Sequence, residues 1–278
     1  MPATETTSSR TPEERYARFR ARRHEVVTAP QGFLALVNTQ WVDGEQPIWG
    51  VPGVWAPLPA GESGLLVRAT AADGIRVDGE LVDGEAIVRG RDTDVPGEIV
   101  FDEHTTGYVI AGHEGTYGLR VWDSESDALH GFGSIDAFPY DPSWIVTGSF
   151  TPNPDGTTAG FQHLKDEGSA RELVIPGRIE FELDGRIHSV LAFQEGRALQ
   201  LVFSDATSGE STYSVGRFLF VTPDPDGTIT LDFNTAVLPP CAFSYNFNCP
   251  MPPKENRFPF AVEAGEKNVL AKDGSPLH

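Results

Sequence analysis

The chain has little of several things that would point to a function. It contains two cysteines in 278 residues and only 21 basic residues against 40 acidic ones, so its formal net charge is −19. Nucleic acids and anionic membrane surfaces are bound by basic protein faces, so we expect neither as a partner. No apolar run approaches the roughly 18 residues that cross a bilayer, and residues 1–15 lack the apolar core of a secretory signal. We therefore expect a cytoplasmic protein. The sequence does not determine its oligomeric state.

The motifs of several enzyme classes are also missing. The sequence has no G-x-G-x-x-G after a strand pattern, no Walker loop and no H-E-x-x-H, which argues against nucleotide and zinc-protease chemistry. Residues 209–213 (Gly-Glu-Ser-Thr-Tyr) lack the second glycine of the G-x-S-x-G nucleophile elbow. Seven residues separate Cys241 from Cys249, whereas zinc motifs use two to four, and no histidine adjoins them. We expect neither a metal site nor a cofactor.

What is present predicts a mainly β fold. After Pro30 the chain consists of short alternating runs separated by glycine, proline and Asp-Gly pairs, which is typical of antiparallel sheets. The pair Asp184-Gly185 predicts a tight hairpin between residues 179–183 and 187–193. Residues 199–203, 217–221 and 229–233 would extend this hairpin into a meander. We expect two packed antiparallel sheets or an open barrel, similar to a β-sandwich.

One helix is expected before the sheets. The sequence Thr11-Pro12-Glu13-Glu14 combines a cap residue, proline at the first helical position and glutamate at the third, which is the capping-box arrangement. Residues 1–28 would then be a polar start and a helix. Residues 29–143 would form an N-terminal β half, ending at an aromatic and proline-rich corner, and residues 144–278 a C-terminal β half.

The most distinctive segment is the Pro-Cys loop, residues 239–257 (PPCAFSYNFNCPMPPKENR). It holds both cysteines and five of the 22 prolines. Because proline fixes φ and removes a backbone donor, the segment cannot be a helix or a central strand. Its aromatics, Phe243, Tyr245 and Phe247, favour an ordered loop over a disordered tail. Long ordered loops in compact domains are often functional.

The Pro-Cys loop also carries a family resemblance. Pro-Pro-Cys-Ala-Phe, then Cys-Pro-x-Pro-Pro-Lys-Glu-Asn-Arg, and then residues 264–267 (Ala-Gly-Glu-Lys) resemble the C-terminal signature of a prokaryotic family. Residues 201–221 and 232–234 extend the resemblance, which runs from about Thr11 to Lys267. The family is domain of unknown function family 1684. The resemblance implies a shared fold and a family-specific loop, and it brings no established activity.

Polar residues of the meander are expected to lie beside this loop. Arg217 offers a planar fork for a carboxylate or phosphate group. Asp232 and Glu255 are candidates for a general acid or base if burial shifts their pKa values. The remaining candidate ligand-binding residues are Asn234, Cys241, Tyr245, Cys249, Asn256 and Arg257. The competing interpretation is that these side chains pair with one another and with the loop backbone, and so attach the loop to the sheet.

Three functional classes follow from this candidate site. The preferred hypothesis is that the protein binds a small molecule between the C-terminal meander and the Pro-Cys loop. This molecule would be anionic if Arg217 anchors it. The alternative is an enzyme of the hydrolase or lyase type that uses the carboxylates and arginine there. A structural or protein-interaction module is the third. Cys241 and Cys249 are either two buried thiols or a disulfide, and the sequence leaves both open.

Overall fold

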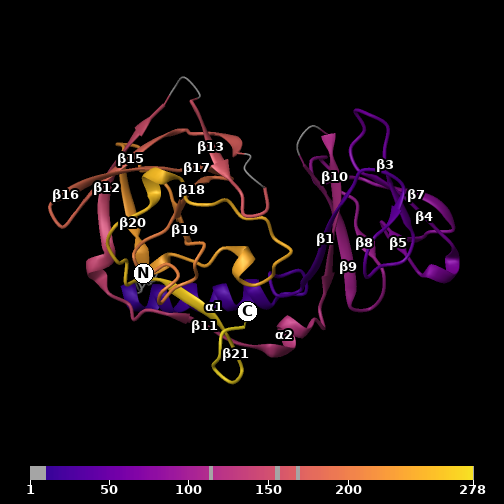
Figure 1. Ribbon diagram of the computed structural model, residues 1–278, viewed down its shortest axis with the longest axis horizontal. Helices are drawn as coiled ribbons and strands as arrows, with labels where there is room; N and C mark the ends of the chain where they lie inside the picture. Colours follow the sequence, from indigo (N-terminus) through magenta and orange to yellow (C-terminus); the bar gives the residue numbers. More distant parts are fainter. Residues whose placement is uncertain (1–10, 113–114, 154–156, 167–169, 278) are drawn as a thin grey trace, which may run out of the picture. The chain divides into compact units, whose positions relative to one another are not determined.

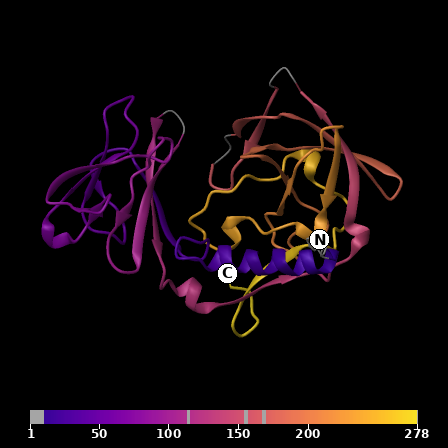
Figure 2. The same ribbon diagram turned by 180° about the vertical axis from the view of Figure 1, so that it is seen from behind.

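The chain folds into two compact units in the computed structural model, which describes residues 11–112, 115–153, 157–166 and 170–277. The first unit comprises the chain up to His24, Gly133–Ala242 and the chain from Asn248 onward. The second comprises Glu25–Phe132 and Phe243–Phe247 (Figure 1; Figure 2, from behind). The expected division between residues 143 and 144 stays a prediction.

The predicted class is confirmed: the fold is mainly β, with several antiparallel sheets and an N-terminal helix. Helix α1 (Pro12–Thr28) begins with the predicted capping box. The Thr11 N–H donates to Glu14 Oε2 at 3.0 Å, and the Glu14 N–H donates to Thr11 Oγ1 at 3.2 Å. A second helix, α2 (Asp127–Gly131), is one short turn. Within the described ranges no sheet closes into a barrel, and no helix has the length and apolarity to span a bilayer.

The second unit packs two antiparallel sheets face to face. The larger sheet has the order β1 (Leu36–Val42), β10 (Tyr117–Asp123), β9 (Thr105–Ala111), β8 (Ile99–Val100), β5 (Arg76–Val77), β6 (Glu80–Leu81). The smaller sheet has the order β2 (Gln46–Pro47), β3 (Val54–Pro57), β4 (Leu65–Ala69), β7 (Gly84–Val88). One core joins them, with Trp55 and Leu65 from the smaller sheet against Val109, Leu119 and Val121 from the larger.

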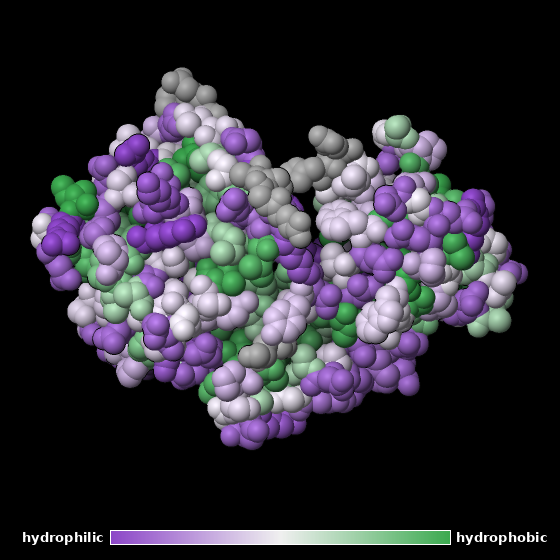
Figure 3. Space-filling model, viewed as in Figure 1, coloured by the Kyte–Doolittle hydropathy of each residue, from purple (hydrophilic) through white to green (hydrophobic). Residues whose placement is uncertain are grey.

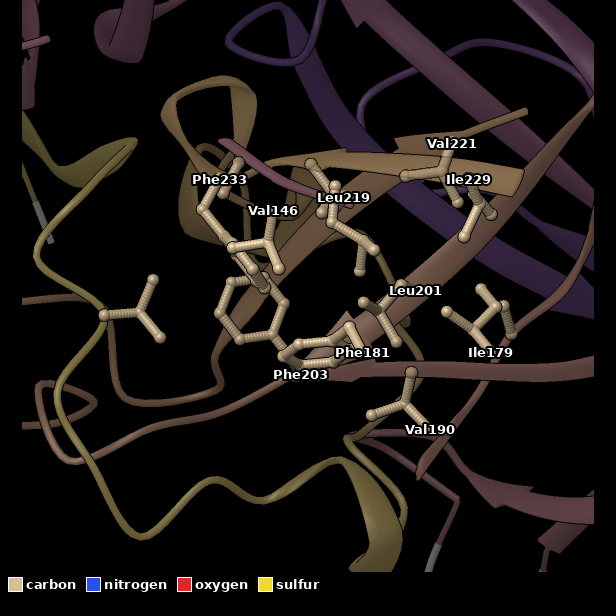
Figure 4. Close-up of a cluster of buried hydrophobic side chains, with 14 of the residues drawn as sticks. Val146, Ile179, Phe181, Val190, Leu201, Phe203, Leu219, Val221, Ile229 and Phe233 are labelled. Carbon is tan, nitrogen blue, oxygen red and sulfur yellow. The ribbon is translucent and has the colours of Figure 1, made fainter. Parts of the chain in front are cut away.

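The described residues of the first unit form four small sheets. The four-stranded sheet has the order β16 (Arg186–Leu191), β15 (Gly177–Leu183), β12 (Ile145–Pro152), β20 (Thr228–Asp232). The three-stranded sheet has the order β17 (Phe193–Glu195), β18 (Ala198–Phe203), β19 (Arg217–Val221). The two-stranded sheets are β13 (Thr158–Gln162) with β14 (Ala170–Val174), and β11 (Phe132–Ala137) with β21 (Glu266–Ala271). Figure 4 shows the core, in which Ile179 and Phe181 meet Leu201, Phe203 and Leu219. Aliphatic and aromatic side chains from the first two sheets therefore share one core.

The predicted strands of the C-terminal half are present, but their expected pairing as one meander is wrong. The hairpin at Asp184-Gly185 forms as predicted, with positive φ angles of 52° and 72° that suit a tight turn. Strand β20, however, pairs with β12 rather than with β19. The correct partner is far away in the sequence, and the alternation within a strand carries no information about it.

The Pro-Cys loop is an ordered irregular segment, as predicted. It has two short 3₁₀ turns, η5 (Pro240–Ala242) and η6 (Lys254–Asn256), and no strand. Phe243 is fully buried and Phe247 nearly so. The segment Phe243–Phe247 belongs to the second unit, while the residues on either side of it belong to the first.

Candidate functional site

Arg217 is completely buried at the start of β19. Its two terminal nitrogens donate inside the protein, while its Nε has no hydrogen-bond partner among the described residues. The terminal nitrogens donate to Asp205 Oδ2 at 2.7 Å, to the carbonyl oxygen of Val262 at 2.8 Å and to that of Ala264. Burial lowers the pKa of Arg217, and the adjacent Asp205 carboxylate opposes that effect. These bonds hold the segment before β21 against β19, which favours a structural role over ligand anchoring.

Asn256 is also fully buried and its amide is fully occupied. Its Oδ1 accepts from the Leu191 N–H at 2.9 Å, and its Nδ2 donates to the carbonyls of Leu191 and Val202, both at 2.8 Å. Its neighbours Glu255 and Arg257 are exposed. Arg257 donates from Nε to the carbonyl of Pro252 at 3.2 Å. The Glu-Asn-Arg triplet therefore contributes one buried amide and two surface charges.

Asp232 and Asn234 form a turn at the end of β20. Asp232 Oδ1 accepts from the backbone N–H and the Nδ2 of Asn234, at 3.1 and 2.9 Å. Asn234 in turn exchanges two hydrogen bonds of 2.9 Å with the backbone of Asp141. No hydrogen bond or ion pair joins Asp232, Arg217 and Glu255 to one another in the described part of the chain.

The two cysteines lie against each other as thiols, both buried and not joined by a disulfide. The Cys241 N–H donates to Cys249 Sγ at 3.3 Å. A side-chain hydrogen bond with Cys249 lowers the pKa of Cys241 below its usual value. Tyr245, between them in sequence, is 63% exposed. Although no histidine is near them in sequence, the fold pairs the His163 backbone with that of Pro250, beside Cys249.

Glu266 belongs to the signature but was not among the predicted site residues. Its carboxylate is buried, and it accepts from Arg20 at 3.2 Å, from Arg23 Nε at 3.0 Å and from the Leu238 N–H at 2.7 Å. Two of the helix arginines thus attach α1 to the β21 region. The arginine-rich helix and the acidic residue of Ala-Gly-Glu-Lys were the sequence signals, but about 240 residues separate the two partners in the chain.

A second group of polar side chains, which sequence reasoning missed, lies on one face of the larger sheet in the second unit. Thr39 on β1 is directly opposite Arg120 on β10, and Arg120 is opposite Tyr108 on β9. Trp122 follows Arg120 by two residues and so shares its face. We call Thr39, Tyr108, Arg120 and Trp122 the Arg120 face; β1, β10 and β9 run side by side in Figure 1.

Three buried polar atoms on the Arg120 face have no hydrogen-bond partner among the described residues. They are Thr39 Oγ1, Arg120 Nε and Trp122 Nε1. More than nine-tenths of buried polar groups in proteins are paired, so three orphans at neighbouring positions need an explanation. The Arg120 guanidinium lies 5.1 Å from the ring centroid of Phe247, from the Pro-Cys loop. No carboxylate pairs with it in the described ranges.

Aromatic stacking extends this face towards a pocket. The Tyr108 ring stacks on Trp122 with centroids 4.3 Å apart, and Arg91 Cζ lies 3.7 Å from the Tyr108 centroid. Arg91 is exposed and makes no ion pair with any described residue. Both Tyr108 and Arg91 line a pocket of about 330 Å³ with Gln31, Thr106 and residues 96–100. A second pocket, of about 430 Å³, lies in the first unit beside β12 and β13, and neither pocket has an orphaned polar atom among its own lining residues.

The sequence comparisons bear on the signature rather than on the Arg120 face. Residues 130–267 match a family described as Protein of unknown function (DUF1684). The chain belongs to this family. The resemblance predicted from the signature is thereby confirmed, and the part of the expected range before residue 130 lies outside the match. Of the residues that form or contact the Arg120 face, Phe247 falls within the DUF1684 match and Thr39, Tyr108, Arg120 and Trp122 do not.

A solved structure is also similar to this DUF1684 protein. It is the solution NMR structure of the uncharacterized protein from gene locus rrnAC0354 of Haloarcula marismortui, which shares 34% sequence identity. The alignment covers 49% of this chain and 77% of that chain, with a TM-score of 0.41. No curated protein matches the chain.

Proposed function

We propose that this protein binds a small anionic molecule and that the Arg120 face of the second unit is its binding site. The observation that carries the proposal is the pair of orphaned donors, Arg120 Nε and Trp122 Nε1. Both atoms can only donate, so an acceptor must be supplied from outside the described chain. A carboxylate or phosphate oxygen is the acceptor that suits a guanidinium best, because the hydrogen bond is then charge-assisted.

The stack beside these donors supports a planar ligand. Tyr108 contacts both Trp122 and Arg91, so an aromatic ring and a second guanidinium adjoin the orphaned donors. Pockets for small molecules are mostly apolar and aromatic, with a few polar groups that fix orientation. The 330 Å³ pocket beside Tyr108 is at the lower end of that size class. We therefore propose a ligand with one aromatic ring and one acidic group.

This site differs from the place that the sequence suggested. Asn234 and Asn256 use their amide groups within the protein, and Arg217 uses both terminal nitrogens there although its Nε has no described partner, which favours a structural role for them. A site between β19 and the Pro-Cys loop stays a prediction. The loop still takes part in the proposed site through Phe247, which lies beneath Arg120. Asp232 and Glu255 make no mutual contact that would suit acid–base catalysis in the described chain, so we propose binding rather than turnover.

Titration calorimetry with phenyl phosphate, benzoate and inorganic phosphate tests the proposal. We expect the two aromatic anions to bind the intact protein and Arg120→Gln to weaken them about tenfold, since a hydrogen bond to a charged group contributes about 1.5 kcal/mol or more. Tyr108→Ala should weaken the binding of phenyl phosphate more than that of inorganic phosphate, because only phenyl phosphate has a ring that can stack on Tyr108. The matched control is Arg76→Gln, an exposed arginine of the same sheet that donates to the Gly79 carbonyl.

Two results would contradict the proposal. One is that none of the three anions binds the intact protein at millimolar concentration. The other is that Arg120→Gln and Arg76→Gln bind the aromatic anions as well as the unmodified protein does. Circular dichroism of each variant confirms that the fold is retained, so that lost binding is not lost structure.

A further inference from the structure

The cysteine pair is the strongest chemical feature that the proposed binding site does not use. The sequence contains only these two cysteines, and the fold brings them into contact. Cys241 is 1% exposed and Cys249 is 4% exposed, and both belong to the first unit. A disulfide requires two cysteine side chains that lie close to each other, as these do.

The main chain on both sides of the pair is fixed. The Cys241 carbonyl accepts from Tyr213 Oη at 3.1 Å, and the Cys249 carbonyl accepts from the Leu164 N–H at 2.9 Å. Beyond Cys249, the Met251 N–H donates to the Gln162 carbonyl at 2.7 Å. Because both cysteines are held from outside the loop, the backbone keeps the two side chains beside each other.

We propose that Cys241 and Cys249 are a redox-sensitive pair that hydrogen peroxide converts to an intramolecular disulfide. The two thiols are held beside each other, with Cys249 Sγ at 3.3 Å from the Cys241 N–H. Peroxide is the oxidant because it is small enough to reach sulfurs that are almost completely buried. A protein disulfide or other bulky partner could not reach either sulfur without opening the loop.

Cys241 is the attacking residue of the pair. The hydrogen bond from Cys249 lowers the pKa of Cys241, the positive charge of Lys165 acts in the same direction, and burial opposes both. A lower pKa raises the thiolate fraction at neutral pH, and the thiolate is the nucleophile. Cys249 is then placed to react with the product formed at Cys241.

The reaction balances in two steps. The Cys241 thiolate attacks one peroxide oxygen, the O–O bond breaks, and the released hydroxide takes a proton to become water, which leaves a sulfenic acid. The Cys249 sulfur then attacks the Cys241 sulfur, the S–O bond breaks, and the departing hydroxyl leaves as water with the Cys249 proton. Overall, two thiols and one hydrogen peroxide give one disulfide and two waters.

The disulfide would close a covalent ring that contains Phe247, a residue of the proposed binding site. Phe243–Phe247 lie between the two cysteines and belong to the second unit, and Phe247 lies beneath Arg120. The redox proposal itself does not depend on ligand binding at the Arg120 face. Its test therefore has a readout in which no ligand takes part.

Intact-mass spectrometry after peroxide treatment provides that test. The reduced protein is exposed to stoichiometric hydrogen peroxide, unfolded, and treated with an alkylating reagent. We expect monomeric protein that has lost two hydrogen masses, takes up no alkylating group, and yields a peptide with Cys241 linked to Cys249. Dithiothreitol should restore both alkylation sites. In Cys249→Ser the first step should stop at the sulfenic acid, which dimedone traps at Cys241.

Three outcomes would overturn the proposal. The first is full alkylation of both cysteines after excess peroxide. The second is a gain of oxygen masses without the loss of two hydrogens, which is overoxidation in place of a disulfide. The third is a disulfide found only between two chains. If Cys249→Ser does not fold, the intact mass of the unsubstituted protein after peroxide treatment still decides between these outcomes.

Discussion

Asn256 shows how one side chain can continue a hydrogen-bond ladder through a proline-rich segment. Its amide presents one acceptor and two donors, which is what a strand would offer to β16 and β18. It bonds to both backbone groups of Leu191 and to the carbonyl of Val202. Prolines at positions 250, 252 and 253 have no N–H to donate. The side chain therefore supplies bonds that the adjoining backbone cannot make.

The residue-scale prediction concerns this amide. Asn256→Ala removes the partner of three backbone groups, two on half-buried Leu191 and one on buried Val202. We expect a loss of about 3 kcal/mol in the free energy of unfolding, because each unsatisfied buried group costs about 1–3 kcal/mol and the effects are not additive. Urea unfolding followed by far-UV circular dichroism measures it. The control is Glu255→Ala, the exposed neighbour in the same turn, for which we expect a change within about 0.5 kcal/mol.

Equal stability losses in Asn256→Ala and Glu255→Ala would contradict this assignment, because burial and bonding would then not distinguish the two positions. The sequence could place Asn256 in a distinctive segment, but it could not separate a structural amide from a ligand-binding one. That distinction depends on Leu191 and Val202, which only the fold brings to it.

Local signals predicted elements, and long-range pairing decided their arrangement. The capping box at Thr11 and the turn at Asp184-Gly185 rest on neighbours within four residues, and both formed as predicted. The pairing of β20 with β12 and the burial of Glu266 depend on partners far along the chain. For the same reason the Arg120 face was missed. The alternation of residues 118–122 was visible, but the register of β10 with β1 and β9 was not.

The attachment of α1 gives the element-scale prediction. Glu266→Gln keeps the side-chain shape and removes the buried charge that Arg20 and Arg23 share. Breaking a buried ion pair from one side costs about 3–5 kcal/mol, and we expect the lower end of that range because Arg20 is 23% exposed. Hydrogen exchange should rise first in the amides of α1. Glu263→Gln, an exposed carboxylate just before it in sequence, is the control.

Unchanged exchange in α1 together with unchanged stability in Glu266→Gln would mean that apolar packing alone holds the helix. Val27 is the buried residue of α1 that such packing would use. A loss of stability without faster exchange in α1 would instead assign the role of Glu266 to its bond with the Leu238 N–H.

At the scale of the whole molecule the acidic residues act in two opposing ways. Hydrophilic residues cover much of the visible surface of each unit (Figure 3), and the net charge of −19 produces self-repulsion that disfavours a compact state. Several aspartates nevertheless stabilise the fold as turn caps that accept backbone, hydroxyl or arginine hydrogen bonds. The described aspartates whose pKa is lowered in this way are Asp73, Asp92, Asp102, Asp141, Asp166, Asp226 and Asp273.

These capped aspartates predict a loss of stability in acid. Each has a folded-state pKa below its ordinary value of 3.8, so its contribution is fully present above that value and is lost as pH falls through the lower folded-state pKa. Protonation also reduces the net charge and relieves self-repulsion, which acts in the opposite direction. Urea unfolding at falling pH, in low salt and in about 1 M salt, where the screening length is about 3 Å, separates the two effects.

In high salt the repulsion between distant charges is screened while the short capping bonds persist, so we expect the free energy of unfolding to fall monotonically below about pH 4. In low salt the relief of repulsion should make that fall shallower. Asp102 is the best single position to examine, because its Oδ1 accepts from the N–H groups of both His104 and Thr105. Asp102→Asn should flatten part of the acid dependence. A stability that rises on acidification even in high salt would mean that self-repulsion, and not capping, governs the pH response of this chain.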